Sequence, residues 1–373
     1  MWQLRPIFLV GLFLLARNES MKYKSNRWAI CFANTHLAKK RVAAARPWMA
    51  LFFLLGLVMS APAQTGIARA AFGPQDAAAI SRPFTDEAGR HVEVPAGVKR
   101  IVSLAPNLTE IVFALGQGDH LAGDTDFCDY PAEASKKPHV GGPVNPNLEQ
   151  VVALKPDLVL ATAINRRETV NALARIGVPV YATDPHSVDS MIGSVEHIGE
   201  VLEAEKTAKP LAAGLRERLS SLDRRIARTT ARRVLFVVWT DPLITVGRDS
   251  FIADALRRAG ARSVVDATAE WPRISFEEIL RLQPEFLVFA NAHAADAQRD
   301  IDALRARPGW RELGAMRRGN IVVVGDAINR PAPRMVDAIE ELARAFHSES
   351  FALRDGHSAA PMPVTEEACS CAR

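Results

Sequence analysis

The sequence predicts an α/β fold, in which two lobes of parallel sheet and helices are joined by one long backbone helix. Three observations support this prediction. Short apolar segments alternate with helical segments along most of the chain, which is typical of parallel sheets covered by helices. One helix–proline–strand unit occurs twice. A long run rich in Ala, Leu, Glu, Lys and Arg lies between the two occurrences and favours a continuous helix.

The first series of elements contains apolar segments of the kind buried in parallel sheets. The expected strands are 91–94, 100–104, 157–161 and 178–182. Asn107 and Glu110 have the spacing of an N-cap and its reciprocal acid, so they predict the start of a helix. Asn147 predicts the start of a second helix, which Pro156 ends, and 167–176 predicts a third.

The run 203–229 predicts the helix that joins the two series. Proline is tolerated in the first turn of a helix, so Pro210 places the expected start near Lys209. About 20 helical residues make a rod of roughly 30 Å, which would limit motion between two lobes. The alternative is an ordinary surface helix of one domain.

The second series repeats the alternation of strands and helices. The expected strands are 233–239, 285–290 and 320–325, and the expected helices are 250–259, 275–282 and 333–346. The chain therefore divides into a signal or targeting region (1–63), a linker with a short leading strand (64–98), an N-terminal lobe (99–202), a connecting helix (203–229), a C-terminal lobe (230–347) and a polar tail expected to be disordered (348–373).

The repeated unit aligns 147–161 with 275–289 without gaps. Both copies have an N-cap, an apolar residue, a Glu, a helix, a proline and an apolar strand. Two similar lobes imply a cleft between them that can enclose a ligand. Glu149 and Glu277 occupy equivalent positions. Each acid stabilises its own helix N-terminus by about 0.3–1 kcal/mol, or the two together present matching charges to a two-fold-symmetric partner.

The N-terminal region predicts export. An apolar run at 48–59 follows a basic segment and precedes the small residues Ala61 and Ala63, which is the pattern of a cleavable signal peptide. The alternative is a membrane anchor. Residues 1–63 carry nine Lys or Arg and one Glu, whereas the remaining chain has a formal net charge of −4. The basic pI therefore comes from the leader, and we expect no nucleic-acid surface.

No catalytic or metal motif is present in the sequence. It contains no G-x-S-x-G, no H-E-x-x-H and no P-loop, and its histidines are scattered. Four cysteines, Cys31, Cys128, Cys369 and Cys371, make neither a disulfide framework nor a convincing metal site. We therefore expect no catalytic residue, metal or resident cofactor. A metal-dependent enzyme using Asp126 or Cys128 is the alternative from another class.

Several segments together resemble a known family. They are 100–116, 128–131, 140–142, 154–159 and 329–334. They are similar to the periplasmic receptors of importers for cobalamin, haem and ferric siderophores, and resemble the cobalamin branch most. The similarity covers about 99–346. It implies the class III periplasmic binding protein fold and a monomer in the periplasm that delivers its ligand to a permease dimer in the inner membrane.

The resemblance also implies roles for individual residues. Glu149 and Glu277 match the acids that dock on permease arginines. The positions that match ligand contacts are Phe127, Trp239, Trp271, Asp326 and Arg330. Phe127 stands where the cobalamin receptors use Tyr, and Pro143 and Thr162 stand where the best-known member uses Trp. The implied ligand is cobalamin or a related corrinoid. Haem or a ferric siderophore is the alternative, and Arg166, Arg167 and Arg330 keep the siderophore interpretation open.

Overall fold

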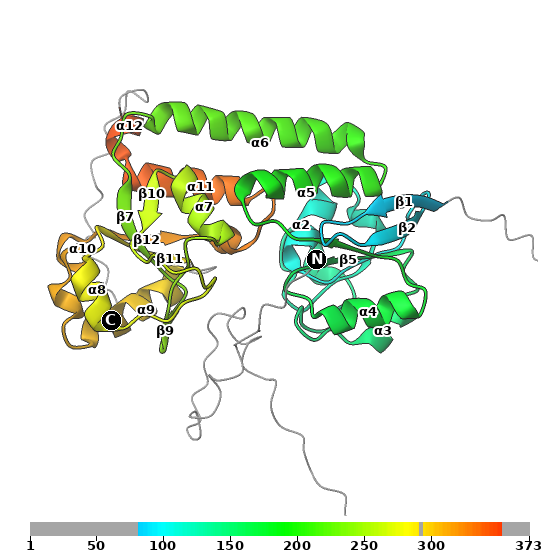
Figure 1. Cartoon of the computed structure of the whole chain (residues 1–373), viewed down its shortest axis with the longest axis horizontal. Helices are drawn as coiled ribbons and strands as arrows, with labels where there is room; N and C mark the ends of the chain where they lie inside the picture. The colour runs from blue at the N-terminus through cyan, green and yellow to red at the C-terminus, as the bar shows by residue number, and fades with distance from the viewer. Residues whose placement is uncertain (1–80, 291–293, 353–373) are drawn as a thin grey trace, which may run out of the picture.

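The computed structural model describes residues 81–290 and 294–352. Two four-stranded parallel sheets form the centres of two lobes, with strand orders β4-β3-β5-β6 and β10-β7-β11-β12 (Figure 1). Helices cover both sheets, so the predicted α/β class with two lobes is confirmed. No helix in this described part of the chain is long and apolar enough to cross a bilayer.

The N-terminal lobe begins with an antiparallel hairpin and continues with parallel strands. Its strands are β1 (Ser81–Thr85), β2 (His91–Pro95), β3 (Ile101–Ser103), β4 (Leu121–Gly123), β5 (Leu158–Thr162) and β6 (Val180–Thr183). Its helices are α2 (Pro106–Ala114), α3 (Leu148–Ala153), α4 (Arg167–Arg175) and α5 (Val188–Val201), with 3₁₀ turns η2 (Gly118–His120) and η3 (Ala134–Lys136).

The C-terminal lobe has the same order of elements around its sheet. Its strands are β7 (Arg232–Val237), β8 (Trp239–Thr240), β9 (Leu243–Ile244), β10 (Ala261–Ser263), β11 (Phe286–Ala290) and β12 (Ile321–Val324). Its helices are α7 (Phe251–Arg258), α8 (Phe276–Leu282), α9 (Ala294–Ala306), α10 (Gly314–Arg318), α11 (Met335–Phe346) and α12 (Ser348–Ala352), with 3₁₀ turns η4 (Trp310–Glu312) and η5 (Asp326–Asn329).

The gapless sequence repeat corresponds to a repeat in backbone conformation. Asn147 caps α3 and Ser275 caps α8 through side-chain hydrogen bonds to the first turn. Lys155 and Gln283 then occupy equivalent positions after the two helices, with φ of 48° and 44°. Each precedes a proline, which disfavours the right-handed helical conformation in the residue before it. The prolines therefore end both helices and direct the chain into β5 and β11.

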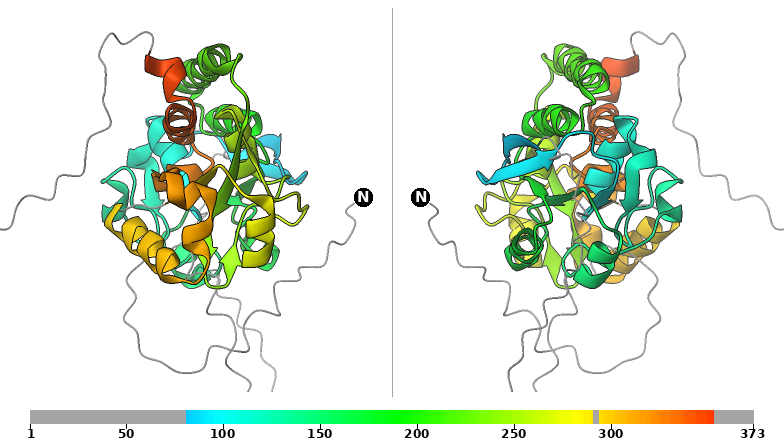
Figure 2. Two further views of the ribbon diagram at one scale, coloured as in Figure 1. Left: turned by 90° about the vertical axis from the view of Figure 1, so that its left-hand side faces the viewer. Right: turned by 90° about the vertical axis from the view of Figure 1, so that its right-hand side faces the viewer.

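The long helix α6 (Glu205–Ile226) has 22 residues and connects the lobes. It buries a stripe with helical spacing, which consists of Ala208, Ala212, Leu215, Leu219, Leu222 and Ile226. Figures 1 and 2 show α6 along the outer edge of the molecule, with α5 and α11 between it and the sheets. The expected start near Lys209 is wrong. Pro210 lies inside the helix but is exposed, so water can reach the carbonyl that loses its partner.

Two further predictions are corrected by the structure. Asn107 is not an N-cap, because α2 begins at Pro106, whose fixed φ and missing N–H suit the first position of a helix. Glu110 is therefore the fifth residue of α2, beyond the capping position, and its side chain is buried. The expectation of disorder from Ser348 onward is wrong for Ser348–Ala352, which form α12. The Phe351 side chain anchors this helix against Arg225 on α6.

One hydrophobic core is shared by the two lobes. It includes buried residues of α2, β3 and β5 from the N-terminal lobe and of β7, α7 and α11 from the C-terminal lobe, together with α5 and α6. Each sheet has a separate cluster on its other face. Because the shared core is continuous, the lobes are packed together on the side nearest α6, and their outer ends carry α3 and α8 (Figure 1).

Candidate functional site

The candidate ligand residues all follow the carboxyl ends of parallel strands, which is where ligands bind in sheets of this kind. Phe127 lies after β4, Trp239 after β7 and Trp271 after β10, whereas Asp326 and Arg330 lie in and after the turn that follows β12. Phe127 belongs to the N-terminal lobe and the other four to the C-terminal lobe. The fold therefore places residues that are up to 203 positions apart after the carboxyl ends of strands in two sheets.

The two tryptophans belong to neighbouring segments of the C-terminal lobe. Trp239 pairs with Ile244 in the β8–β9 hairpin, and Ile244 also forms a bridge with Arg273, next to the segment of Trp271. The Trp239 indole Nε1 donates a hydrogen bond of 2.8 Å to the Asp241 carbonyl. Both indoles are half-buried, so each keeps apolar surface that solvent or a ligand can reach.

The two polar candidates are part of an ion cluster between the lobes. We define the junction cluster as Glu110, Asp129, Asp326, Arg330 and Arg334. The Arg330 guanidinium contacts Glu110 at 3.1 Å, Asp129 at 2.5 Å and Asp326 at 2.7 Å, and its side chain is 1% exposed. The structure thus brings Asp326 and Arg330 together, and it pairs Arg330 with the protein's own carboxylates.

The electrostatics of the junction cluster follow from this pairing. Burial alone would lower the pKa of Arg330, but the hydrogen bond to Asp129 and the charges of Asp326 and Glu110 outweigh it and raise that pKa. Burial also lowers the pKa of Arg334, but the hydrogen bond to Glu110 and the charge of Glu110 outweigh burial and raise that pKa. The Arg334 guanidinium also lies 3.7 Å from the centre of the Tyr130 ring. Both arginines are therefore charged at neutral pH.

The sequence pattern predicted a capping role for Glu110, and its role in the junction cluster was not predicted. No local sequence pattern indicates this role, because Glu110 is separated from its partners Arg330 and Arg334 by 220 and 224 positions. The proline at position 106 was the available warning, since it marks an earlier helix start.

The alternative nucleophile and metal residues are arranged for structure. Cys128 is buried and contacts the hydroxyls of Thr109 and Thr125, and burial raises the pKa of its thiol to about 12. A thiol of this kind is not a nucleophile at neutral pH. Asp124 pairs with His139 Nδ1 at 2.7 Å, and burial raises the pKa of Asp124 to about 7. Within residues 81–290 and 294–352, no three His, Cys, Asp or Glu side chains are grouped as metal ligands.

The two candidate docking acids are equivalent in structure. Glu149 and Glu277 are the second residues of α3 and α8, and both side chains are exposed. The two helices lie on the side of the molecule opposite α6, one in each lobe (Figure 1). Hydrogen bonds from its own backbone N–H and from Ser275 lower the pKa of Glu277. The face therefore presents two separated negative charges.

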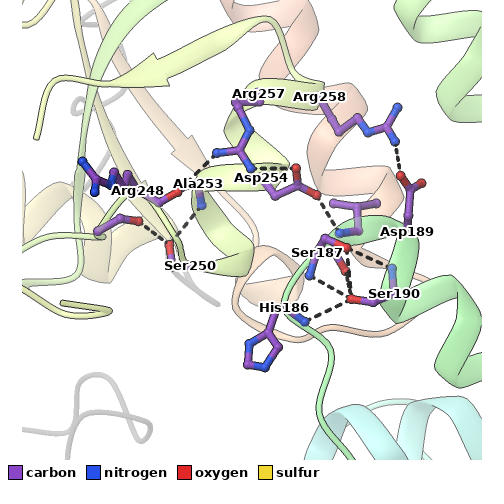
Figure 3. Close-up of polar contacts among 12 residues, drawn as sticks. His186, Ser187, Asp189, Ser190, Arg248, Ser250, Ala253, Asp254, Arg257 and Arg258 are labelled. Carbon is purple, nitrogen blue, oxygen red and sulfur yellow. Dashed lines mark hydrogen bonds and ion pairs between the residues drawn. The ribbon is translucent and has the colours of Figure 1, made fainter. Parts of the chain in front are cut away.

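A second polar junction joins the lobes beneath α6. Figure 3 shows Asp254 of α7 near the start of α5, beside the Ser187–Ser190 capping pair. The Asp254 carboxylate accepts a hydrogen bond of 2.7 Å from the Val188 N–H. A carboxylate at a helix N-terminus is stabilised by the helix dipole. This contact, which the sequence analysis did not find, ties α7 of one lobe to α5 of the other.

Comparison with known proteins identifies the family. Residues 101–327, which include both sheets, match the family described as periplasmic binding protein. The chain belongs to this family. The match also includes the α6 connector, so the predicted class III fold is confirmed. The family consists of transport components without enzymatic activity.

Individual relatives support the same assignment. The chain is 31% identical over 275 residues to the uncharacterized ABC transporter substrate-binding lipoprotein YvrC of Bacillus subtilis (strain 168), covering 71% of this chain and 85% of the relative. It is 31% identical over 255 residues to the vitamin B12-binding protein of Vibrio parahaemolyticus serotype O3:K6 (strain RIMD 2210633), covering 67% and 90%. The solved apo structure of the periplasmic heme-binding protein RhuT from Roseiflexus sp. RS-1 superposes with a TM-score of 0.62 at 26% identity, covering 68% and 100%. This family member is therefore a substrate-binding protein of an ABC transporter.

Proposed function

We propose that this protein binds cobalamin or a related corrinoid between its lobes and delivers it to the permease of an ABC importer. The observation that carries the proposal is the set of half-buried aromatics that follow strand ends in both lobes, with half-buried Asp326 and buried Arg330 after β12. Phe127, Trp239 and Trp271 supply flat apolar surface for a large ring. Asp326 contacts the polar edge of the ligand. Arg330 also contacts the ligand when Asp129 moves away from the Arg330 guanidinium. The vitamin B12-binding relative supports this ligand class.

The charges near the candidate ligand residues favour a corrinoid over haem. A corrin ring is edged mainly by neutral amides, whereas haem carries two carboxylates. Arg330 and Arg334 already pair with carboxylates of the protein. Tyr181 is 2% exposed in the core, so its phenol is not placed as an axial ligand for haem iron. Tyr130 is exposed and has Arg334 over its ring. Haem or a ferric siderophore is the second candidate, and the structural likeness to a heme-binding protein is what favours haem.

A titration of the purified protein distinguishes these ligands. Cyanocobalamin, haemin and a ferric hydroxamate are each added and followed by calorimetry and visible absorption. We expect saturable binding of cyanocobalamin alone. Trp239→Ala and Trp271→Ala each weaken it about tenfold, because a lost aromatic contact is worth about 1–2 kcal/mol. Ile176→Ala is the control, because Ile176 is a 61% exposed apolar residue after α4. Binding of haemin or the hydroxamate with no response to cyanocobalamin contradicts the corrinoid proposal.

We further propose that Glu149 and Glu277 dock the protein onto a symmetric permease dimer. Their support is their equivalent exposed positions on the face opposite α6. The double change Glu149→Arg and Glu277→Arg is expected to abolish uptake while ligand affinity stays within about twofold. Glu205→Arg is the matched control, since Glu205 lies in the first turn of α6 on the opposite face. Unchanged uptake by the double variant contradicts the docking proposal.

Export to the periplasm and a monomeric state complete the proposal. The signal segment 1–63, the tail cysteines and most of the leader-proximal linker lie outside the described residues. N-terminal sequencing of the exported protein is expected to give a start near Ala63 or Ala70.

Light scattering coupled to gel filtration is expected to give the mass of one chain, and a dimer mass would contradict the monomer.

A further inference from the structure

The junction cluster connects the two lobes through both oxygens of one carboxylate. Glu110, on α2 of the N-terminal lobe, accepts hydrogen bonds at Oε2 from Arg334 Nε (2.9 Å) and at Oε1 from Arg334 Nη2 (2.6 Å). Its Oε1 also accepts from Arg330 Nη1 at 3.1 Å. Both arginines lie in the segment between β12 and α11 of the C-terminal lobe. One side chain of one lobe therefore orients two side chains of the other.

The burial of this contact distinguishes Glu110 from the other acids of the cluster. The side chains of Glu110 and Arg330 are 2% and 1% exposed. Asp129, which also belongs to the N-terminal lobe, is 57% exposed, so water competes for its contact with Arg330. Asp326 belongs to the same lobe as Arg330 and does not cross the junction. Glu110 is thus the buried acid of the cluster that links one lobe to the other.

Separation of the lobes at this point would leave the buried Glu110 carboxylate without its two arginine partners, whereas Arg330 would keep Asp326. A buried charge is costly unless it is paired and hydrogen-bonded, and the cost rises steeply when one partner is removed. Any movement of α2 away from the β12–α11 segment breaks the bonds to Arg330 and Arg334 together. The contact therefore favours one spacing between the loop that carries Phe127 and the segments that carry Trp239 and Trp271.

We propose that Glu110 is a positioning residue that fixes the spacing between the loop of one lobe that carries Phe127 and the segments of the other that carry Trp239 and Trp271. It acts through Arg330 and Arg334 and does not itself touch the ligand. This role requires no particular ligand. It therefore remains testable whether or not the corrinoid proposal is correct.

The test measures the distance between the lobes in the ligand-free protein. Spin labels are introduced through noncanonical amino acids at Glu168 on α4 and Arg317 on α10, which are both exposed, so all cysteines are kept. Double electron–electron resonance then gives the distance distribution. Glu110→Gln keeps the shape of the side chain and removes its charge. We expect this variant to broaden the distribution and to add a longer-distance population.

The matched control is Glu196→Gln. Glu196 also forms a two-bond contact with an arginine, Arg216, but within the α5–α6 pair and outside the junction. We expect its distance distribution to equal that of the unchanged protein. If Glu110→Gln does not fold, Arg334→Gln is measured, because Arg334 is 24% exposed and its loss frees only one of the two contacts. An unchanged distribution in a folded junction variant, or equal broadening in Glu196→Gln, overturns the proposal.

Discussion

The two polar junctions between the lobes use the same residue types in different surroundings. In the junction cluster, Glu110 and Arg330 are almost completely buried, and their contacts replace water. In the junction beneath α6, Arg258 is 27% exposed and bridges Asp189 and Asp223, which are 67% and 46% exposed. Figure 3 shows the contact between Arg258 and Asp189. The comparison teaches that the number of ion pairs does not measure how firmly two lobes are joined. The desolvation of the charges decides it.

The largest expected effect is at the buried junction. Glu110→Ala removes the shared carboxylate partner of two arginines: Arg334 loses its ion pair, and Arg330 keeps only Asp129 and Asp326. Because breaking a buried ion pair by removing one partner is costly, we expect a loss of about 3–5 kcal/mol in the free energy of unfolding. Urea denaturation followed by circular dichroism measures it. A loss below about 1 kcal/mol would mean that the cluster is solvated, and it would remove the difference between the two junctions.

The second prediction concerns Asp124, a buried acid outside the two junctions, and its effect on stability as the pH changes. Burial raises the pKa of Asp124 to about 7 from 3.8, so its contribution to stability is complete below about pH 4 and is lost as the pH rises to about 7. In Asp124→Asn, this loss disappears. We expect the difference in free energy of unfolding, variant minus unchanged protein, to increase between pH 4 and pH 7. The increase should be on the order of a few kcal/mol.

Urea titrations at several pH values across that window measure the effect of Asp124→Asn. His139 faces Asp124 at 2.7 Å, with Lys137 and Asp126 also near enough to influence its charge. The paired control is Asp126→Asn, since Asp126 is exposed. Parallel pH profiles for the unchanged protein and Asp124→Asn would show that the Asp124 carboxylate is ionised throughout.

The smallest expected effect is at Arg258, in the junction beneath α6. Arg258→Ala breaks the contacts with Asp189 and Asp223, and we expect a loss of only about 0.2–1 kcal/mol, because water solvates the released acids. Salt should reduce this loss further, since exposed pairs are screened. Urea denaturation at low and high ionic strength measures both effects. A loss as large as that of Glu110→Ala would show that burial does not separate the two junctions.

Much of the fold could be predicted because its signals are local. Asn147 and Ser275 begin helices, and Pro156 and Pro284 end them, through contacts within a few residues of the chain. The same local pattern placed Glu149 and Glu277 at equivalent positions. Helix α5 was missed, although Ser187 and Ser190 form its capping box and were available as a signal.

The sequence by itself determined the two similar lobes, the connecting helix and the equivalence of the two exposed acids, because each depends on neighbours along the chain. Only the tertiary structure decided the role of Glu110, the burial of Arg330 and the continuation of α6 through Pro210. These features depend on which distant groups replace water around a charge or a carbonyl. A local pattern does not contain that information, since the partners of Glu110 lie more than 200 positions away.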